Sequence, residues 1–211
     1  MLDLVLPQEC GGCGAPSTRW CSACAAALTV AADEPHLITP RVDPGVPVFA
    51  LGRYAGSRRQ AIVALKEHGR TDLIPPLASG LALGLGHLLA WGMVDIPLTI
   101  VPAPTRRSAA RRRGGDPVTR LARTAARGYP GIAVVPALRL KAFVRDSVGL
   151  TGAAREQNIA GRVLLTASAL PSAGVLIVDD IVTTGATARE SVRTLQTAGA
   201  QVAGVLAIAA A

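Results

Sequence analysis

The sequence has few aromatic residues, no long apolar run and no secretion signal, and each absence excludes a class of protein. Aromatic side chains make up 3% of the chain, too few for a platform on which single-stranded nucleic acid stacks. No uninterrupted apolar run reaches the roughly 18–20 residues of a membrane helix. The best candidate, 81–98, contains His87, Asp95 and three glycines. The first four residues lack the basic and apolar regions of a signal peptide. We therefore expect a cytoplasmic protein without membrane insertion.

Several motifs of common enzyme classes are also absent. The sequence has no G-x-x-x-x-G-K-[ST], which excludes a P-loop ATPase, and no G-x-G-x-x-G after a predicted strand. It has no G-x-S-x-G, and no Cys–His pair outside the first 24 residues, which argues against acyl-transfer catalysis.

Lysine is scarce as well, although the chain is basic. Among 22 basic side chains only Lys66 and Lys141 are lysines, and with 14 acidic side chains the net charge is +8. Arginine forks suit phosphate and carboxylate, so the surplus indicates anionic partners, either nucleic acid or phosphorylated small molecules. An arginine-rich, lysine-poor composition also arises from genomic base composition alone. Half of the 211 residues are hydrophobic, which is typical of a globular protein.

The chain divides into three parts. Residues 1–32 contain all four cysteines, residues 33–47 contain four prolines and are predicted to be a linker, and residues 48–211 alternate short apolar runs with helical patterns. This alternation predicts an α/β domain with a mainly parallel sheet flanked by helices. The predicted strands are 48–54, 98–101, 132–136, 175–178 and 201–208; the predicted helices are 58–66, 73–89, 117–127 and 187–198, with a short turn or helix at 155–159.

The cysteines form two Cys-x-x-Cys pairs, Cys10/Cys13 and Cys21/Cys24, seven residues apart. Each pair folds into a knuckle that directs two thiolates at one point, and two facing knuckles give the four sulfurs of a structural zinc site. Two disulfides and a redox pair are the alternatives. Neither is favoured, because nothing indicates export and a redox motif normally occurs alone. We expect a compact zinc ribbon whose metal has no open coordination position.

The most informative segment is 175–187, where an apolar strand runs into Asp179 and Asp180 and then into a turn of hydroxyls and glycine before a helix. Ligands of open α/β sheets bind at the carboxyl ends of strands. The helix start favours a phosphate, to which Thr183, Thr184 and Thr187 add hydroxyls and Gly185 allows close approach. The two acids suit ribose hydroxyls, directly or through Mg²⁺. The plainer alternative is that Asp180 ends a strand and Thr187 caps a helix. The pattern predicts a sugar-phosphate site.

This segment resembles the phosphoribosyl diphosphate (PRPP) signature of the type I phosphoribosyltransferases. The resemblance implies that Asp179 and Asp180 contact the ribose of PRPP, together with Mg²⁺. It implies that the 5-phosphate lies in a loop formed by Thr183, Thr184, Gly185, Ala186 and Thr187.

The whole chain is similar to the ComF-like competence branch of that superfamily. The shared features are the cysteine-rich start, the segment 65–70 (LKEHGR), the strand end 101–104 (VPAP) followed by arginines, and the element 155–158 (REQN). The resemblance implies a type I phosphoribosyltransferase-like fold after the zinc ribbon. The chain departs from the family pattern at 113–117, which reads RGGDP instead of RGFNQ, and at Ser147, where glutamine is usual.

Arginines crowd the loop after the predicted strand 98–101, at 106, 107 and 111–113. Ala103, Arg106 and Arg107 could hold the pyrophosphate leaving group, whose developing charge must be stabilised; we place Lys66 on the same side. His68 follows Lys66 and could also lie near the ligand. The same arginines could grip a nucleic-acid backbone, or form a solvated basic loop.

Two functions follow as hypotheses. The first is phosphoribosyl transfer from PRPP to an acceptor that the sequence does not identify, with release of pyrophosphate. The second is a non-enzymatic accessory of DNA uptake that binds DNA or a competence helicase, as the family resemblance implies. Asp179 and Asp180 favour the first, because carboxylates repel phosphate unless Mg²⁺ or a ribose diol intervenes.

Overall fold

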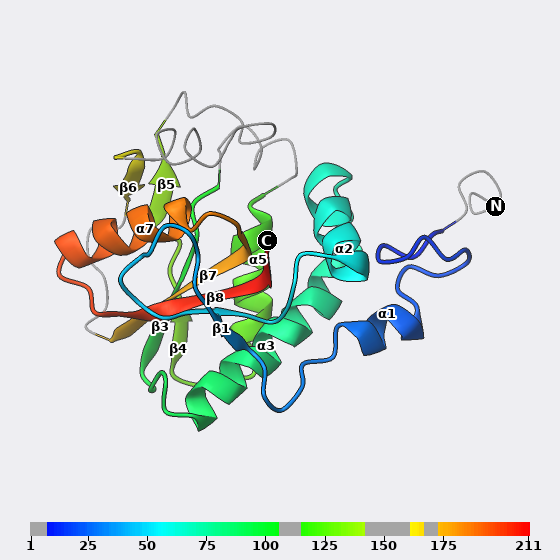
Figure 1. The fold of residues 1–211 in the computed structure, drawn as a ribbon, viewed down its shortest axis with the longest axis horizontal. Coiled ribbons are helices and arrows are strands. Elements are labelled where there is room, and N and C mark those ends of the chain that lie inside the picture. Colours follow the sequence, from blue (N-terminus) through cyan, green and yellow to red (C-terminus); the bar gives the residue numbers. More distant parts are fainter. Residues whose placement is uncertain (1–7, 106–114, 142–160, 167–172) are drawn as a thin grey trace.

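The computed structural model describes residues 8–105, 115–141, 161–166 and 173–211. Its central element is a six-stranded sheet with the spatial order β1-β2-β8-β7-β3-β4, in which all neighbours are parallel except β1, which is antiparallel to β2 (Figure 1). Two further strands, β5 and β6, form a separate antiparallel pair. The strands are β1 (His36–Ile38), β2 (Val48–Ala50), β3 (Leu98–Pro102), β4 (Ile132–Val134), β5 (Leu138–Leu140), β6 (Val163–Leu165), β7 (Gly174–Val182) and β8 (Val202–Ala210).

Helices cover both faces of this sheet. The side chains of β7 alternate between two hydrophobic cores: Leu176 and Val178 pack in one, and Val175 and Ile177 in the other. Strands buried on both faces lack the polar alternation of half-exposed strands, which explains the continuous apolar runs in the sequence. The first core contains residues of α2 (Gly56–Glu67), the 3₁₀ turn η2 (Thr71–Leu73), α3 (Ile74–Ala90) and α5 (Pro117–Ala126); the second contains those of α7 (Ala186–Thr197) and the β5–β6 pair.

This arrangement confirms the predicted α/β class with a mostly parallel sheet flanked by helices. The structure adds the strands β5 and β6, which the sequence did not predict, and the strand predicted at 48–54 ends at Ala50. Two further differences bear on the site. The segment 33–47, predicted to be a linker, contributes the edge strand β1, because Leu37 pairs with Phe49 of β2. The strand predicted at 175–178 extends to Val182, because Ile181 and Val182 continue the pairing with Ala209 and Ala210 of β8. The short element predicted at 155–159 lies outside the described residues.

The connections of β3 and β7 leave the sheet on opposite faces. The chain after β3 leads to α5, whose Leu121 and Ala122 belong to the first core, while the chain after β7 leads to α7, whose Val192 belongs to the second. Since β3 and β7 are adjacent and parallel, their carboxyl ends form a topological switch point. Open α/β sheets bind ligands at such points.

The longest described helical stretch is Thr71–Ala90. Judged by length and composition alone, it could cross a membrane. Half of its most apolar window is buried inside the protein, where Leu77, Leu81 and Leu85 pack in the first core. These are the properties of a core helix. The window 81–98, which had the strongest apolar character in the sequence, is not one helix, because α3 ends at Ala90 and β3 begins at Leu98.

Asp116 forms the N-cap of α5. Its carboxylate accepts hydrogen bonds from the backbone N–H groups of Val118 (3.2 Å) and Thr119 (3.1 Å) and from the hydroxyl of Thr105 (3.1 Å), which follows β3. Asp116 therefore caps a helix and also holds the chain after β3.

We expect Asp116→Ala to lower the free energy of unfolding by about 1–2 kcal/mol, because the substitution leaves the first-turn N–H groups of α5 without their acceptor. Denaturant unfolding measures this change. Asp95→Ala, which removes a carboxylate from an exposed loop, is the control and is expected to change stability by less than about 0.5 kcal/mol. Equal effects of the two substitutions would contradict the capping role.

Candidate functional site

The two predicted ribose carboxylates lie in β7, beyond the end of its neighbour β3. Pro102 pairs with Val178, and the last hydrogen bond between the strands runs from Ala103 N to Val178 O (2.8 Å). Asp179 and Asp180 follow directly, while β8 continues alongside β7 on the other edge. The acid pair therefore lies at the switch point, on the strand edge that β3 leaves unpaired.

Asp180 is buried and faces a lysine. Its Oδ2 lies 2.7 Å from Nζ of Lys66, in the last turn of α2, and its side chain is 4% exposed against 28% for Lys66. The Lys66 ammonium is the partner of Asp180 Oδ2 in this ion pair. Within the described residues, Oδ2 accepts no hydrogen bond of good geometry. Lys66, which the sequence analysis placed on the pyrophosphate side, thus contacts Asp180, one of the two predicted ribose carboxylates.

Asp179 is half-buried, and its Oδ1 accepts a hydrogen bond from Asp180 N (2.8 Å). Desolvation by the surrounding protein raises the pKa of Asp179 well above its usual range, and the adjacent Asp180 carboxylate raises it further, whereas Lys66 acts in the opposite direction. Two carboxylates in one poorly solvated position are unfavourable unless cations offset them. The pair therefore suits a cation or a hydroxyl donor.

The predicted phosphate loop, 183–187, connects β7 to α7. Gly185 is the N-cap residue of α7 in the left-handed conformation (φ 87°), and Thr184 Oγ1 accepts from Ala186 N (3.3 Å). The capping hydroxyl thus belongs to Thr184, and Thr187 lies inside the first turn. The other first-turn N–H groups have no intrahelical acceptor, a favourable position for an anion.

Gly185 is also required for a contact that the sequence did not indicate. A Cβ at this position would lie 2.3 Å from Val42 O and 2.8 Å from Pro40 Cβ, and Val42 N donates to Thr184 O (2.8 Å). The segment 40–42 therefore packs against the loop. The glycine accommodates this segment, whereas the sequence suggested that it admits a phosphate.

The remaining predicted residues have different positions. Ala103 is buried at the end of β3, and its N–H already donates to Val178 O. Ala103 therefore has no free backbone donor for a pyrophosphate. Arg106 and Arg107, the arginines at 111–113, Ser147 and the element 155–158 lie outside the described residues. His68 is the C-cap residue of α2, two positions after Lys66.

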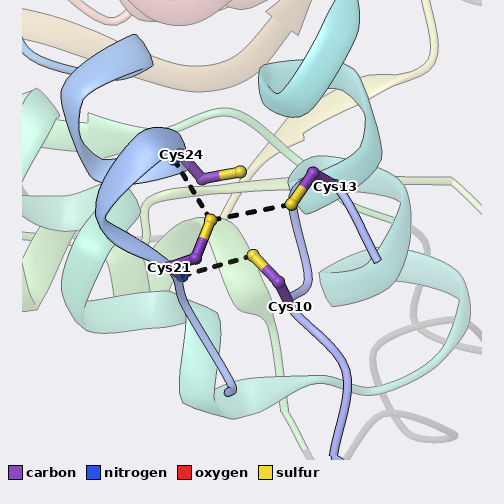
Figure 2. A group of neighbouring side chains, drawn as sticks. All are labelled: Cys10, Cys13, Cys21 and Cys24. Atoms are coloured by element: carbon purple, nitrogen blue, oxygen red, sulfur yellow. Dashed lines mark hydrogen bonds between the residues drawn. The ribbon is translucent and has the colours of Figure 1, made fainter. Parts of the chain in front are cut away.

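The four cysteines form a second site, at the N-terminal end. Cys10, Cys13, Cys21 and Cys24 place their sulfur atoms within 4.8 Å of one another, and all four are free thiols (Figure 2). The sulfurs of Cys13 and Cys21 are 3.6 Å apart. In a tetrahedral site with metal–sulfur bonds of about 2.3 Å, sulfurs are about 3.8 Å apart. The cluster can therefore hold a metal ion such as zinc, whose four coordination positions would all be occupied by cysteine sulfurs.

The backbone around the cysteines supports thiolates. Cys10 Sγ accepts from the N–H groups of Gly12 (3.5 Å) and Cys21 (3.4 Å), and Cys21 Sγ accepts from Cys24 N (3.4 Å). Burial raises the pKa of the Cys10 thiol, but backbone donors, that of Cys21 foremost, outweigh it, so that the pKa falls to about 6. Burial and the neighbouring thiols raise the pKa of Cys24. A bound cation would relieve this crowding.

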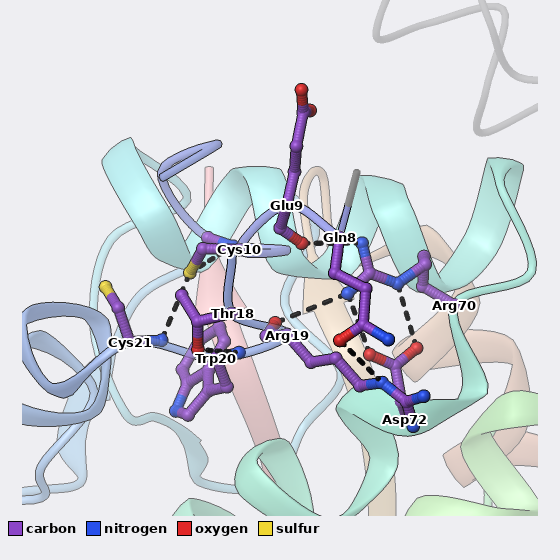
Figure 3. A network of polar contacts seen from close by, with 10 residues as sticks. Gln8, Glu9, Cys10, Thr18, Arg19, Trp20, Cys21, Arg70 and Asp72 are labelled. Carbon is purple, nitrogen blue, oxygen red and sulfur yellow. Dashed lines mark hydrogen bonds and ion pairs between the residues drawn. The ribbon is translucent and has the colours of Figure 1, made fainter. Parts of the chain in front are cut away.

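Arg70 connects the cysteine cluster to the α/β domain (Figure 3). Its guanidinium donates to the carbonyls of Glu9 (3.0 Å) and Arg19 (3.3 Å) and forms a two-point ion pair with Asp72 (2.9 and 2.8 Å). The hydrogen bond from Arg70 holds the pKa of Asp72 below its usual range. Apolar packing adds to this link, since Gly11 lies directly against Leu73. Sequence analysis had singled out the segment 65–70 but gave no sign of this contact.

A comparison of the chain with models of known protein families finds no match, and neither does a comparison with curated proteins.

We expect the purified protein to carry about one metal ion per chain, held by the four cysteines. Cys21→Ser should lose this metal and lower the melting temperature, although serine retains the ability to cap α1 (Ser22–Ala27). Elemental analysis and a thermal melt measure the two effects, with Ser22→Ala as the control at the neighbouring exposed position. A metal-free wild-type protein with an unchanged melting temperature in Cys21→Ser would contradict the assignment.

We expect Asp179→Asn to raise the melting temperature of the ligand-free protein, because the substitution removes one of two adjacent, poorly solvated carboxylates and keeps an oxygen that accepts from Asp180 N. Thermal melts at pH 7 compare this variant with Asp95→Asn, which should leave the melting temperature unchanged. A lower melting temperature for Asp179→Asn would show that the acid pair is not a strained arrangement.

Proposed function

We propose that the chain binds PRPP at the carboxyl ends of β3 and β7 and is a member of the type I phosphoribosyltransferase superfamily, in its ComF-like branch. The observation that carries this proposal is the acid pair at a switch point, followed two residues later by a hydroxyl-rich turn and a helix N-terminus. A diol can bond to the carboxylates while a phosphate on the same sugar reaches the start of α7.

Each part of PRPP then has a partner of suitable chemistry. Asp179 and Asp180 accept hydrogen bonds from the ribose hydroxyls, and the loop 183–187 binds the 5-phosphate through its hydroxyls and the first-turn N–H groups of α7. Lys66 lies 2.7 Å from Asp180 and offsets the charge of the acid pair. The pyrophosphate extends toward the chain that follows β3, beyond Ala103. Arg106 and Arg107, to which the sequence analysis assigned it, lie outside the described residues.

The corresponding reaction breaks the bond between C1 of the ribose and a pyrophosphate oxygen and forms a bond from C1 to the acceptor. The pyrophosphate leaves with the bonding electron pair, and the ribose passes through an oxocarbenium-like state. Mg²⁺ bound together with PRPP would offset the negative charge that develops on the leaving pyrophosphate oxygens. The contribution of this chain is to orient the ribose and the phosphates and to stabilise the charge that develops in the transition state. No covalent intermediate with the protein forms. We propose that this takes place in the cytoplasm, and that Zn²⁺ in the cysteine cluster is structural.

The test is a calorimetric titration of PRPP with Mg²⁺ into the wild type, Asp179→Asn/Asp180→Asn and the control Asp95→Asn. We expect micromolar-range binding for the wild type and the control. The double variant should bind at least about tenfold more weakly, because charged hydrogen bonds to the ribose are lost.

Binding that the double variant retains would reject the site assignment. A folded wild type that binds no PRPP would reject the function and favour the second candidate below.

The second candidate, a DNA-uptake accessory that binds DNA or a helicase, is favoured by one observation. The exposed face of α5 and its end presents Arg120, Arg123 and Arg127, with no acidic residue in the first turn. Such a ridge suits a phosphate backbone. This second candidate function gives no role to Asp179 and Asp180, and we therefore rank it below PRPP binding.

A further inference from the structure

The end of α2 lies between the two sites. It carries Lys66, whose ammonium contacts Asp180 at 2.7 Å. Four residues later, the guanidinium of Arg70 contacts the backbone of the cysteine-containing segment at Glu9 and Arg19. Cys10 follows Glu9 directly, and Cys21 lies two residues after Arg19. One short stretch of chain therefore touches both the cysteine cluster and the acid pair.

Arg70 is fixed to the helix end by its backbone as well as by its side chain. The N–H groups of His68 and Arg70 both donate to Ala64 O (3.1 Å each), so the chain folds back on the last turn of α2. Gly69, with φ 65°, makes this reversal possible. Ala64 lies two residues before Lys66, in the same turn. A displacement of Arg70 would therefore loosen the turn that presents the Lys66 side chain.

The side chain of Arg70 has no freedom to compensate. Nε and Nη2 of Arg70 donate to the Asp72 carboxylate (2.9 and 2.8 Å). Nη1 donates to Glu9 O, and Nη2 also donates to Arg19 O. These carbonyls keep their positions only while the segment 9–21 is folded, and the cysteine cluster is what closes this segment. Further ties within it include the isolated bridge between Glu9 and Pro16 and the hydrogen bonds from Gly11 N to Arg19 O (3.0 Å) and from Cys10 N to Ala15 O (2.8 Å).

We propose that Arg70 is a positioning residue through which the folded cysteine cluster holds Lys66 against Asp180. The consequence for ligand binding rests on the proposed function: when the cluster loses its metal, Lys66 leaves Asp180, and the acid pair binds the ribose of PRPP more weakly. The cysteine cluster then supports the sugar-phosphate site without contacting the ligand.

The composition of the chain allows a direct test, because Lys66 and Lys141 are the only lysines and Lys141 is exposed. Limited acetylation by an amine-reactive ester, followed by peptide mass spectrometry, gives the ratio of modification at Lys66 to that at Lys141. The Lys66 ammonium is protected by its ion pair, so the wild-type ratio should be low, and Asp180→Asn should raise it.

We expect Arg70→Ala to raise the ratio by about threefold or more, in keeping with the loss of an ion pair, and Arg70→Lys to restore part of the protection. Treatment of the wild type with a chelator should raise the ratio similarly. Arg19→Ala is the matched control: it removes an arginine of the same segment and keeps the carbonyl that Arg70 bonds, so its ratio should equal that of the wild type. Asp72→Asn, which weakens the clamp on Arg70 without truncating it, replaces Arg70→Ala if that variant does not fold.

A folded Arg70→Ala or Asp72→Asn protein with the wild-type ratio would overturn the proposal, as would a chelated protein that loses its metal with no change at Lys66. The PRPP titration is run on the same variants, with a loss of about threefold or more in affinity expected for Arg70→Ala and none for Arg19→Ala. If the wild type binds no PRPP, the proposed function fails, while the acetylation ratio still decides the positioning role.

Discussion

Two neighbouring carboxylates within the buried strand β7, just beyond the end of its neighbour β3, are the constraint to which the rest of the site responds. Their desolvation and mutual repulsion disfavour the charged state of Asp179. Among the described residues, the Lys66 ammonium, 2.7 Å from Asp180, offsets this repulsion. The pairing of β3 with β7 ends at Pro102, which leaves the edge of β7 beside the acids unpaired. A core that only needed stability would place an apolar pair here, since burying charge seldom improves stability. The arrangement agrees with the proposed ribose site.

The sequence was sufficient for the class of the fold, because short apolar runs between helical patterns require a sheet that is buried on both faces. It was also sufficient for the cysteine cluster, because two Cys-x-x-Cys spacings leave the thiols few arrangements. It was not sufficient for the length of β7: two acids after four apolar residues resemble a strand end, whereas Ile181 and Val182 continue the ladder with β8. Local polarity is a poor guide to where a strand ends when its neighbour on one side continues.

The contacts between distant segments were not predictable. Lys66 was visible as part of a conspicuous segment, but its pairing with Asp180 depends on how α2 packs over the sheet. Arg70 belongs to the same segment, but only the folded chain shows that it binds backbone carbonyls more than fifty residues away. Gly185 had a plausible local role, and the contact with Val42 gives it a second one. In each case the residue was identified, whereas its partner was set by tertiary packing.

The segment 40–42 has a practical consequence for how this chain can be divided. Composition suggests a boundary near residue 47, and a shortened chain starting at Val48 would look like a complete α/β domain. Such a chain would lack the backbone donor of Val42 to Thr184, the atoms that pack on Gly185, and the strand that covers the edge of β2. The β7–α7 turn would lose the segment that packs against it. The edge strand β2 would be left with unpaired backbone groups, which favour self-association. The proline-rich stretch is thus a structural part of the α/β domain, and the smallest unit worth isolating includes it.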